Sequence, residues 1–263
     1  MPGGIALNGN SLQTTGISQI ITSNIDHHSM PKKNISMAAL AYGNRSKITN
    51  SNYVDKQITI SGTLAATNGS IITMDALEDT FKSYLVGTDG NLDIEHGSST
   101  RRYLATPEVV KIDRNGGLAF GTFEVTFTCS RPFGIDLTAT QLDLTTGHTA
   151  ATRLIPIAIV GSAEYQFPLV KITLVSGTQL TNGTISIGNN ANGQTLNITS
   201  PTWAAGDVLE IDPYESIVKI NSVEVPFTGA FPSFKSGTQF MTYTDTFLTR
   251  SVNFDISQYG YWN

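Results

Sequence analysis

Three small groups of residues in this chain have the types and spacing that could support chemistry. His27 and His28 carry imidazoles, which bind transition metals. Glu210 and Asp212 stand two residues apart in a strand-like segment, where paired carboxylates could bind calcium or assist a reaction. Cys129 is the one cysteine and could supply a thiolate nucleophile. Each group also has a structural interpretation, which has to be weighed beside the chemical one.

Structural roles explain all three groups more simply than chemistry does. Neighbouring His27 and His28 would point to opposite sides of a strand, so we expect a solvated loop there rather than a metal site. Glu210 and Asp212 fit the outward face of a strand, since a calcium cage needs six or more oxygen ligands. Cys129 alternates with apolar residues and is expected to be a buried small hydrophobe, with no partner for an intramolecular disulfide.

The sequence contains none of the local motifs that identify common enzyme classes. It has no Gly-x-Ser-x-Gly elbow, no His-Glu-x-x-His and no phosphate-binding glycine loop. The four histidines fall in no motif, and the carboxylate separation that glycoside hydrolysis needs is a property of the fold. We therefore expect no enzyme activity, no catalytic residue, no cofactor and no metal.

Aromatic residues in the second half of the chain make a carbohydrate-binding module the alternative function. A β-sandwich can present aromatic rings, which combine an apolar face with a polar tip. Trp203 and Trp262 are the candidate glycan contacts, while packing within the sandwich is the structural interpretation of both. The other candidates are Tyr214, Tyr243, Tyr259 and Tyr261.

The composition indicates a β-rich protein with weakly charged surfaces. Charged residues make up 14% of the 263 residues, against roughly 25% in an average domain. The net charge of −5 argues against nucleic acid as the main partner. A polar β-protein and a surface covered by other subunits both fit this composition. No apolar run approaches the roughly 20 residues of a membrane helix, and no signal peptide is recognisable, so no membrane insertion is expected.

The first half of the chain predicts one clear hairpin and one helix. Within Gly121–Cys129 the apolar residues alternate with polar ones, which is typical of a half-buried strand. The turn signal Asn115-Gly116-Gly117 pairs it with Val109–Ile112. Apolar residues at helical spacing predict a helix over 73–86, with Thr73 as its N-cap.

The second half predicts an antiparallel β-sandwich. Short strand-like segments follow one another with Gly, Asn or Pro turns and no helix between them. Residues 135–150 read as a linker, so we expect an N-terminal domain over 1–140 and a C-terminal domain over 150–263. The predicted strands are Leu154–Val160, Leu169–Val175, Thr184–Ile187, Thr195–Ile198, Val208–Ile211, Ile217–Val225 and Val252–Ile256.

Several segments are informative when taken in order along the chain. The N-terminal half has, in sequence, QITISGTL, MDALEDTFKSYLVG, RRYLAT and GTFEVTFTCSRPFG. The C-terminal half continues with GDVLEIDP, VKINSVEVPFTGAFPSFKSGTQ and VNFDISQYGYW. In this order the segments together resemble the distal tail protein (Dit) family of long-tailed bacteriophages. The resemblance covers nearly the whole chain. It departs at Lys219-Ile220-Asn221-Ser222, where many relatives have Asn-Gly, and in the polar 27–45 segment, which does not align.

This resemblance implies a mainly β fold, with a ring-forming N-terminal domain that contains one helix and a C-terminal galectin-like antiparallel β-sandwich. It implies a structural virion protein that forms a homohexameric hub ring at the end of a siphovirus tail. The implied partners are the tail tube protein, a tail-tip hub protein and a receptor-binding protein, and the implied location is the tail tip or baseplate of a virion assembled in the host cytoplasm. No catalytic residue carries over, because the family has none. We also expect the N-terminal strands and the 27–45 segment to contribute to contacts between subunits.

Overall fold

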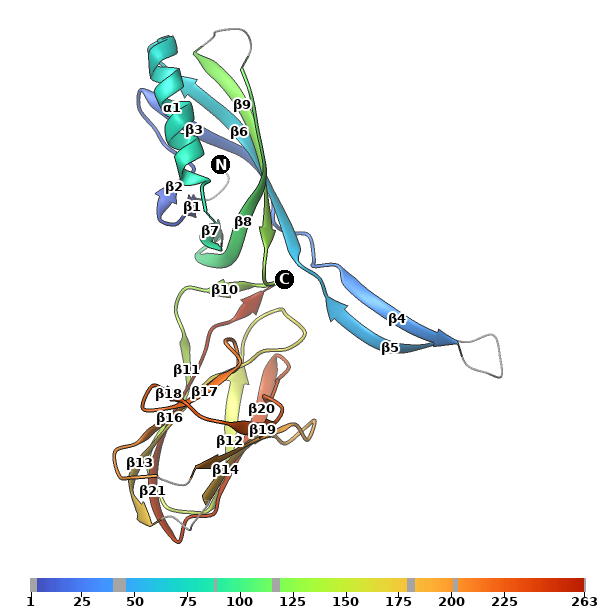
Figure 1. Ribbon diagram of the computed structural model, residues 1–263, viewed down its shortest axis with the longest axis vertical. Helices are drawn as coiled ribbons and strands as arrows, with labels where there is room; N and C mark the ends of the chain where they lie inside the picture. Colours follow the sequence, from blue (N-terminus) through green and yellow to red (C-terminus); the bar gives the residue numbers. More distant parts are fainter. Residues whose placement is uncertain are drawn as a thin grey trace. The chain divides into compact units, whose positions relative to one another are not determined.

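The structure is a computed structural model that describes residues 4–39, 46–87, 89–114, 119–178, 183–200 and 203–262. The chain divides into two compact units, Met1–Leu137 and Thr138–Trp262 (Figure 1). Strands dominate both units, and one helix lies in the first. The mainly β fold class predicted from the sequence is therefore confirmed. No helix in the described ranges has the length and apolarity to cross a membrane.

The first unit is built on one antiparallel sheet. Its strand order is β2-β1-β7-β8-β9-β6-β3, so strands far apart in the sequence become neighbours. The strands are β1 (Ile5–Leu7), β2 (Asn10–Ser11), β3 (Ser18–Asp26), β6 (Lys56–Ala66), β7 (Gly90–His96), β8 (Ser99–Asp113) and β9 (Phe120–Cys129), with the short β10 (Gly134–Asp136) beside β8.

The predicted hairpin around residue 115 is confirmed as the pair β8 and β9, in which Val110 faces Val125. Alternate residues of β9 are buried, because one face of the sheet packs against the core. The buried residues are Phe123, Val125, Phe127 and Cys129.

Helix α1 (Ile71–Tyr84) covers the inner face of this sheet (Figure 1). It begins two residues earlier than predicted because Ser70, not Thr73, is the N-cap. The Ser70 hydroxyl accepts a hydrogen bond from Thr73 N at 3.3 Å, which satisfies an end amide of the helix. Glu78 and Lys82, one turn apart on the helix, form an ion pair with Oε1 and Nζ 2.6 Å apart.

Packing of α1 on the sheet follows the apolar stripe seen in the sequence. Met74, Leu77 and Phe81 are buried, and the Phe81 ring contacts Phe123 of β9 with the ring centroids 4.7 Å apart. Burying large apolar side chains of this kind contributes roughly 1.5–3 kcal/mol each. The helix is therefore held by its contacts rather than by its helix propensity alone.

A separate two-stranded sheet interrupts the first unit. Strands β4 (Lys33–Ala39) and β5 (Ser46–Tyr53) pair antiparallel with each other and with no other described strand. The chain enters and leaves this hairpin at one point, since Val54 N donates to Lys32 O at 2.9 Å. The sequence predicted a loop at 27–34, so β4 begins within a segment expected to be irregular.

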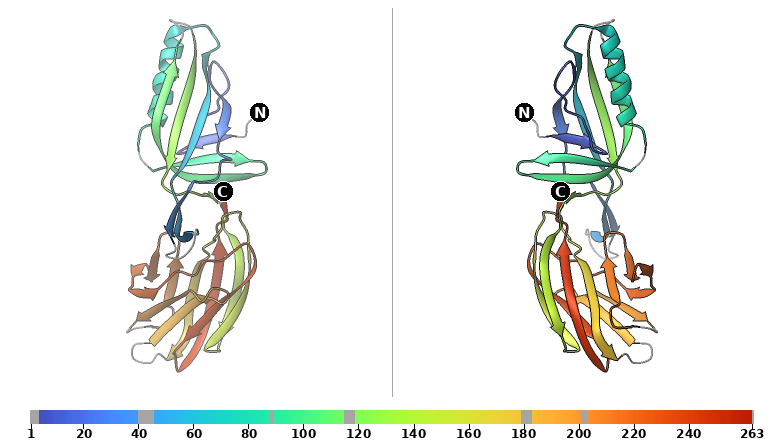
Figure 2. Two further views of the ribbon diagram at one scale, coloured as in Figure 1. Left: turned by 90° about the vertical axis from the view of Figure 1, so that its right-hand side faces the viewer. Right: turned by 90° about the vertical axis from the view of Figure 1, so that its left-hand side faces the viewer.

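The second unit is an antiparallel sandwich of two sheets, as predicted (Figure 2). The first sheet has the order β11-β21-β13-β16-β17-β18 and the second β12-β20-β14-β15-β19. The first contains β11 (Thr140–His148), β13 (Leu169–Thr178), β16 (Val208–Asp212), β17 (Ile217–Ile220), β18 (Val223–Glu224) and β21 (Thr249–Gln258). The second contains β12 (Thr152–Ile159), β14 (Gly183–Asn189), β15 (Thr195–Ser200), β19 (Phe227–Gly229) and β20 (Gly237–Asp245), and β22 (Tyr261–Trp262) ends the described chain.

The interior of the sandwich is one apolar cluster drawn from both sheets, including Ile155, Phe254 and Met241. Two details differ from the sequence prediction. The expected linker 135–150 is mostly strand, because its Thr-rich segment forms β11 and pairs with β21, while its first two residues belong to β10, which pairs with β8. The expected strand 217–225 is a hairpin instead, since Asn221 and Ser222 both have positive φ, at 49° and 69°.

Candidate functional site

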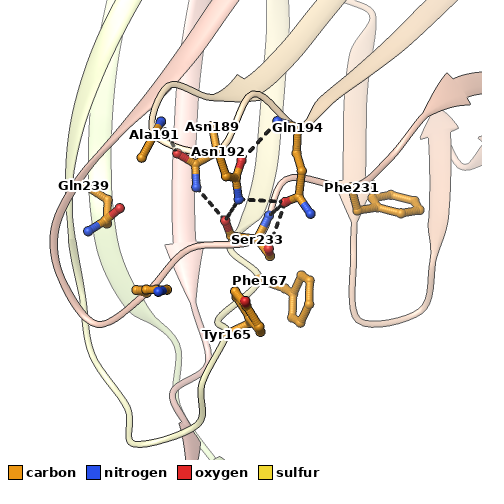
Figure 3. Close-up of a pocket in the computed structure, with 10 residues that line it drawn as sticks. Tyr165, Phe167, Asn189, Ala191, Asn192, Gln194, Phe231, Ser233 and Gln239 are labelled. Atoms are coloured by element: carbon orange, nitrogen blue, oxygen red, sulfur yellow. Dashed lines mark hydrogen bonds between the residues drawn. The ribbon is translucent and has the colours of Figure 1, made fainter. Parts of the chain in front are cut away.

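A pocket of about 760 Å³ opens at one end of the second unit and is its best candidate for a binding site (Figure 3). Three segments build it: the connection between β12 and β13, the turn after β14, and the chain from β19 into β20. Its lining residues are Tyr165, Phe167, Asn189, Ala191, Asn192, Gln194, Phe231, Ser233, Lys235 and Gln239.

Side-chain amides fix the shape of this pocket. Gln194 Oε1 accepts hydrogen bonds from the Ser233 backbone N and from Ser233 Oγ, both at 2.8 Å. Asn189 Nδ2 donates to Ser233 O at 2.5 Å (Figure 3). Ser233 and Asn189 are buried, so these bonds satisfy polar groups that water does not reach. The turn after β14 and the segment before β20 therefore hold each other in place.

The chemistry of the lining suits a polar ligand with apolar faces. Tyr165 is 39% exposed, and the rings of Phe167 and Phe231, which also line the pocket, are half-buried. The side chains of Lys235 and Gln239 line the pocket as well and could contact a ligand. Sites that bind sugars or peptide segments use aromatic rings to stack against the ligand and side-chain amides to form hydrogen bonds with it.

The aromatic residues selected from the sequence lie elsewhere. Trp203 is 8% exposed and packs against Phe247, with ring centroids 6.1 Å apart, so it presents little ring surface. Trp262 is half-buried. Tyr243 and Tyr261 are buried, Tyr214 is half-buried beside Tyr261, and Tyr259 is exposed. Glycan contact by Trp203 or Trp262 stays a prediction, and sequence reasoning did not single out the pocket's own Tyr165, Phe167 and Phe231.

The two carboxylates of β16 have structural partners. Glu210 pairs with Lys171 on the adjacent strand β13, with the Oε2 to Nζ distance at 3.0 Å. Asp212 Oδ1 accepts hydrogen bonds from the backbone N of Tyr214 at 2.9 Å and of Glu215 at 3.1 Å. The Asp212 hydrogen bonds close the turn after β16, whereas the Glu210 pair links two strands; both carboxylates thus have structural contacts, while the sequence predicted only an outward strand face.

Cys129 is fully buried on β9, as predicted. Burial raises the pKa of its thiol to about 12, although the nearby Lys56 ammonium opposes the shift. The thiol is therefore protonated at neutral pH and enclosed by the core. Both properties are those of a structural cysteine rather than of a nucleophile.

The histidines of the first unit are arranged differently from the sequence expectation. His27 and His28 were expected to point apart in a solvated loop, but their ring centroids lie 4.0 Å apart and His27 is buried. They follow the end of β3, where the strand alternation no longer applies. His96, at the end of β7, joins them with ring centroids 5.7 Å from His27 and 5.2 Å from His28. Sequence reasoning missed His96, which is distant in the chain.

Burial lowers the pKa of His27 to about 4, and the adjacent His28 lowers it further, while the backbone of Ile25 opposes the shift. Burial also lowers the pKa of His96, with Arg101 and His28 as smaller causes. His27 is therefore an uncharged imidazole at neutral pH.

Comparison with known proteins gives a match at the level of structure. No protein-family model and no curated protein matches the sequence. The crystal structure of the Dit protein of phage SPP1, titled a paradigm of the hub adsorption apparatus in phages that infect Gram-positive bacteria, matches with a TM-score of 0.70. The two chains share 12% identity, and the match covers 97% of this chain and 98% of that one.

Two structures of the phage P2 baseplate in its activated conformation also match along the chain. With Ca the TM-score is 0.44 at 9% identity, over 98% of both chains. With Sr it is 0.43 at 11% identity, over 98% of this chain and 97% of the other. Scores of this size do not establish a shared fold, whereas the SPP1 match does. The chain thus has, over almost its whole length, the fold of the phage SPP1 Dit protein.

Proposed function

We propose that this protein is a structural component of a bacteriophage tail tip or baseplate, a distal tail protein that forms a hexameric hub ring. The observation that carries the proposal is the fold match to the SPP1 Dit protein over 97% of this chain. In this role the ring joins the tail tube to the tail-tip hub protein and to the receptor-binding protein. The role requires no catalytic group.

A hub of this kind needs a surface on which one copy contacts the next. Closed rings of identical chains use heterologous contacts, in which two different surfaces of each copy meet. The hairpin β4–β5 supports such a contact, because its strands pair with no other described strand and leave backbone edges available. The side chains of residues 33–36 are exposed, so this end of the hairpin presents accessible surface to a neighbouring copy.

The direct test is the mass of the purified chain by light scattering, with negative-stain images of the same sample. The expected result is a six-fold ring with an open centre, either alone or on addition of the tail tube protein. A single-chain mass at high concentration together with no binding to the tube protein would contradict the proposal.

Replacing residues 33–53 with Asn-Gly is expected to reduce the ring to single chains. A two-residue turn can connect the remaining ends, because Lys32 and Val54 are already joined by a backbone hydrogen bond. The second unit should keep its unfolding transition, which tryptophan fluorescence reports because Trp203 and Trp262 both belong to that unit. Tyr165→Ala serves as the control that keeps the ring mass. An unchanged mass after the replacement would assign the subunit contact to another surface.

The pocket supports a second candidate function, the binding of a carbohydrate by the second unit. Tyr165→Ala is expected to weaken binding to host cell-wall glycans at least tenfold, since an aromatic ring on a sugar contributes on the order of 1.4 kcal/mol or more. Tyr259→Ala is the matched control, because Tyr259 is exposed to the same extent, 40% against 39%, and lies outside the pocket. Binding to a glycan array is measured for both variants and for the unaltered protein. Equal losses of binding in the two variants, or no binding by the unaltered protein, would contradict this candidate function.

A further inference from the structure

We propose that His27, His28 and His96 form a binding site for a single divalent transition-metal ion of the zinc class, with the remaining coordination position open to water or to a ligand. One nitrogen from each of the three imidazoles lies within 4.8 Å of the other two. This gathering of ligands is the observation that carries the proposal.

The distances are close to those of a three-histidine metal site. Zinc bound by imidazole has Zn–N distances of about 2.0–2.1 Å, which places tetrahedral ligand nitrogens about 3.3 Å apart. The nitrogens of this cluster must therefore approach one another by about 1.5 Å at most. Rotation of exposed His28 and half-buried His96 about their side-chain bonds can supply that movement.

The backbone supplies the ligands from the ends of two strands. His27 and His28 directly follow β3, and His96 is the last residue of β7. These strands stand at separate places in the order β2-β1-β7-β8-β9-β6-β3, so the histidines meet only because the sheet curls. A metal ion would link the edge strand β3 to β7 and hold that curl.

The state of His27 points to a ligand as well. Its ring is 6% exposed, and in the part of the chain that the structure describes neither Nδ1 nor Nε2 makes a hydrogen bond of normal length and angle, although the Ile25 backbone is near enough to raise its pKa. A buried polar nitrogen without a partner costs free energy, which a metal bond to one nitrogen would offset. Its low pKa fits this role, because a metal binds the neutral imidazole.

The surroundings select the class of ion. Three nitrogen ligands favour Zn²⁺, Co²⁺ or Ni²⁺, whereas Ca²⁺ and Mg²⁺ prefer oxygen. Two cations oppose a bound dication, since Lys56 lowers the pKa of His27 and Arg101 lowers that of His96. The Asp26 carboxylate partly offsets this charge, since it raises the pKa of Lys56, which burial lowers. A site of three neutral ligands beside these cations should therefore release its metal to a strong chelator.

Calorimetric titration of the untagged full chain with Zn²⁺, and visible absorption with Co²⁺, test the site. The expected result is one ion per chain and a tetrahedral Co²⁺ spectrum without a thiolate charge-transfer band, since Cys129 is not among the ligands. His28→Gln and His96→Gln should each weaken Zn²⁺ binding at least about tenfold.

The matched control is His148→Gln, because His148 is the one histidine of the chain outside the cluster. Circular dichroism should show that all three variants are folded, which is expected since neither His28 nor His96 is buried. The proposal would be overturned if Zn²⁺ gave no heat of binding and Co²⁺ no tetrahedral absorption band. It would also be overturned if His96→Gln and His148→Gln bound Zn²⁺ with equal affinity, and the three rings would then be explained by aromatic packing.

Discussion

Replacing Asp245 with Ala is expected to lower the free energy of unfolding of the second unit by about 3–5 kcal/mol, the cost of breaking a buried ion pair. The Asp245 carboxylate is fully buried and 2.7 Å from Arg250 Nε. It also accepts hydrogen bonds from the Tyr243 hydroxyl at 2.6 Å and from Phe247 N at 2.8 Å. Removing the carboxylate leaves Arg250 Nε and the buried Tyr243 hydroxyl without this acceptor, which is why the cost is large.

Tryptophan fluorescence during chemical denaturation measures this effect, because both tryptophans lie in the second unit. A loss of 3–5 kcal/mol corresponds to a fall of roughly 10 °C or more in its thermal midpoint. The matched control is Glu210→Ala, which removes a partly exposed ion pair of the same unit and should cost less than about 1 kcal/mol. Equal losses in the two variants would show that the Asp245 contacts do not stabilise the unit.

Asp245 also shows why part of the sandwich escaped prediction from the sequence. Strand β20 lies between β12 and β14, yet no strand was predicted at 237–245. Its inner face ends in a carboxylate, and Phe240 on the outer face is 42% exposed, so the apolar alternation is obscured. The ion pair with Arg250 and the hydrogen bonds from Tyr243 and Phe247 together make a charged residue acceptable inside the sandwich.

Elements with local signals were predictable. The alternation of β9 and the apolar stripe of α1 depend on residues two to four apart, and both are present in the structure. The start of α1 was misplaced because Ser70 and Thr73 are both good N-caps, and the chain uses the earlier one.

The candidate sites could not be predicted from short stretches of sequence, because each brings together residues that are far apart in the chain. The pocket joins Tyr165 to Gln194 and Ser233, which come from three separate connections. The histidine cluster depends on His96 reaching the end of β3, although His96 comes 69 positions after His27 in the sequence. Residue type alone pointed to Trp203, since a tryptophan can serve either a core or a binding surface until its exposure is known.

Replacing Gly62 with Ala is expected to destabilise the first unit by about 3 kcal/mol or more, at the upper end of the cost of overfilling a core. Gly62 lies on β6 opposite a register shift in β3, a bulge between Thr22 and Asn24. A Cβ atom at this position would overlap Ile21 O and lie 2.8 Å from Phe123 Cζ. The backbone oxygen cannot move without breaking the pairing of β3 with β6, and the ring is held under α1 by Phe81.

Reactivity of the Cys129 thiol toward a thiol-specific reagent measures this loss, because the residue is buried in the first unit and the second unit has no cysteine. Exposure of the thiol should occur at a lower denaturant concentration in Gly62→Ala than in the unaltered protein. Gly121→Ala on the adjacent strand β9 is the matched control, since its Cβ would come no closer than 3.0 Å, to Asp113 O. It should shift the transition much less, and a larger shift for Gly121→Ala than for Gly62→Ala would contradict the role of the bulge. The position therefore requires glycine because three strands and a helix converge on the side that a Cβ would occupy.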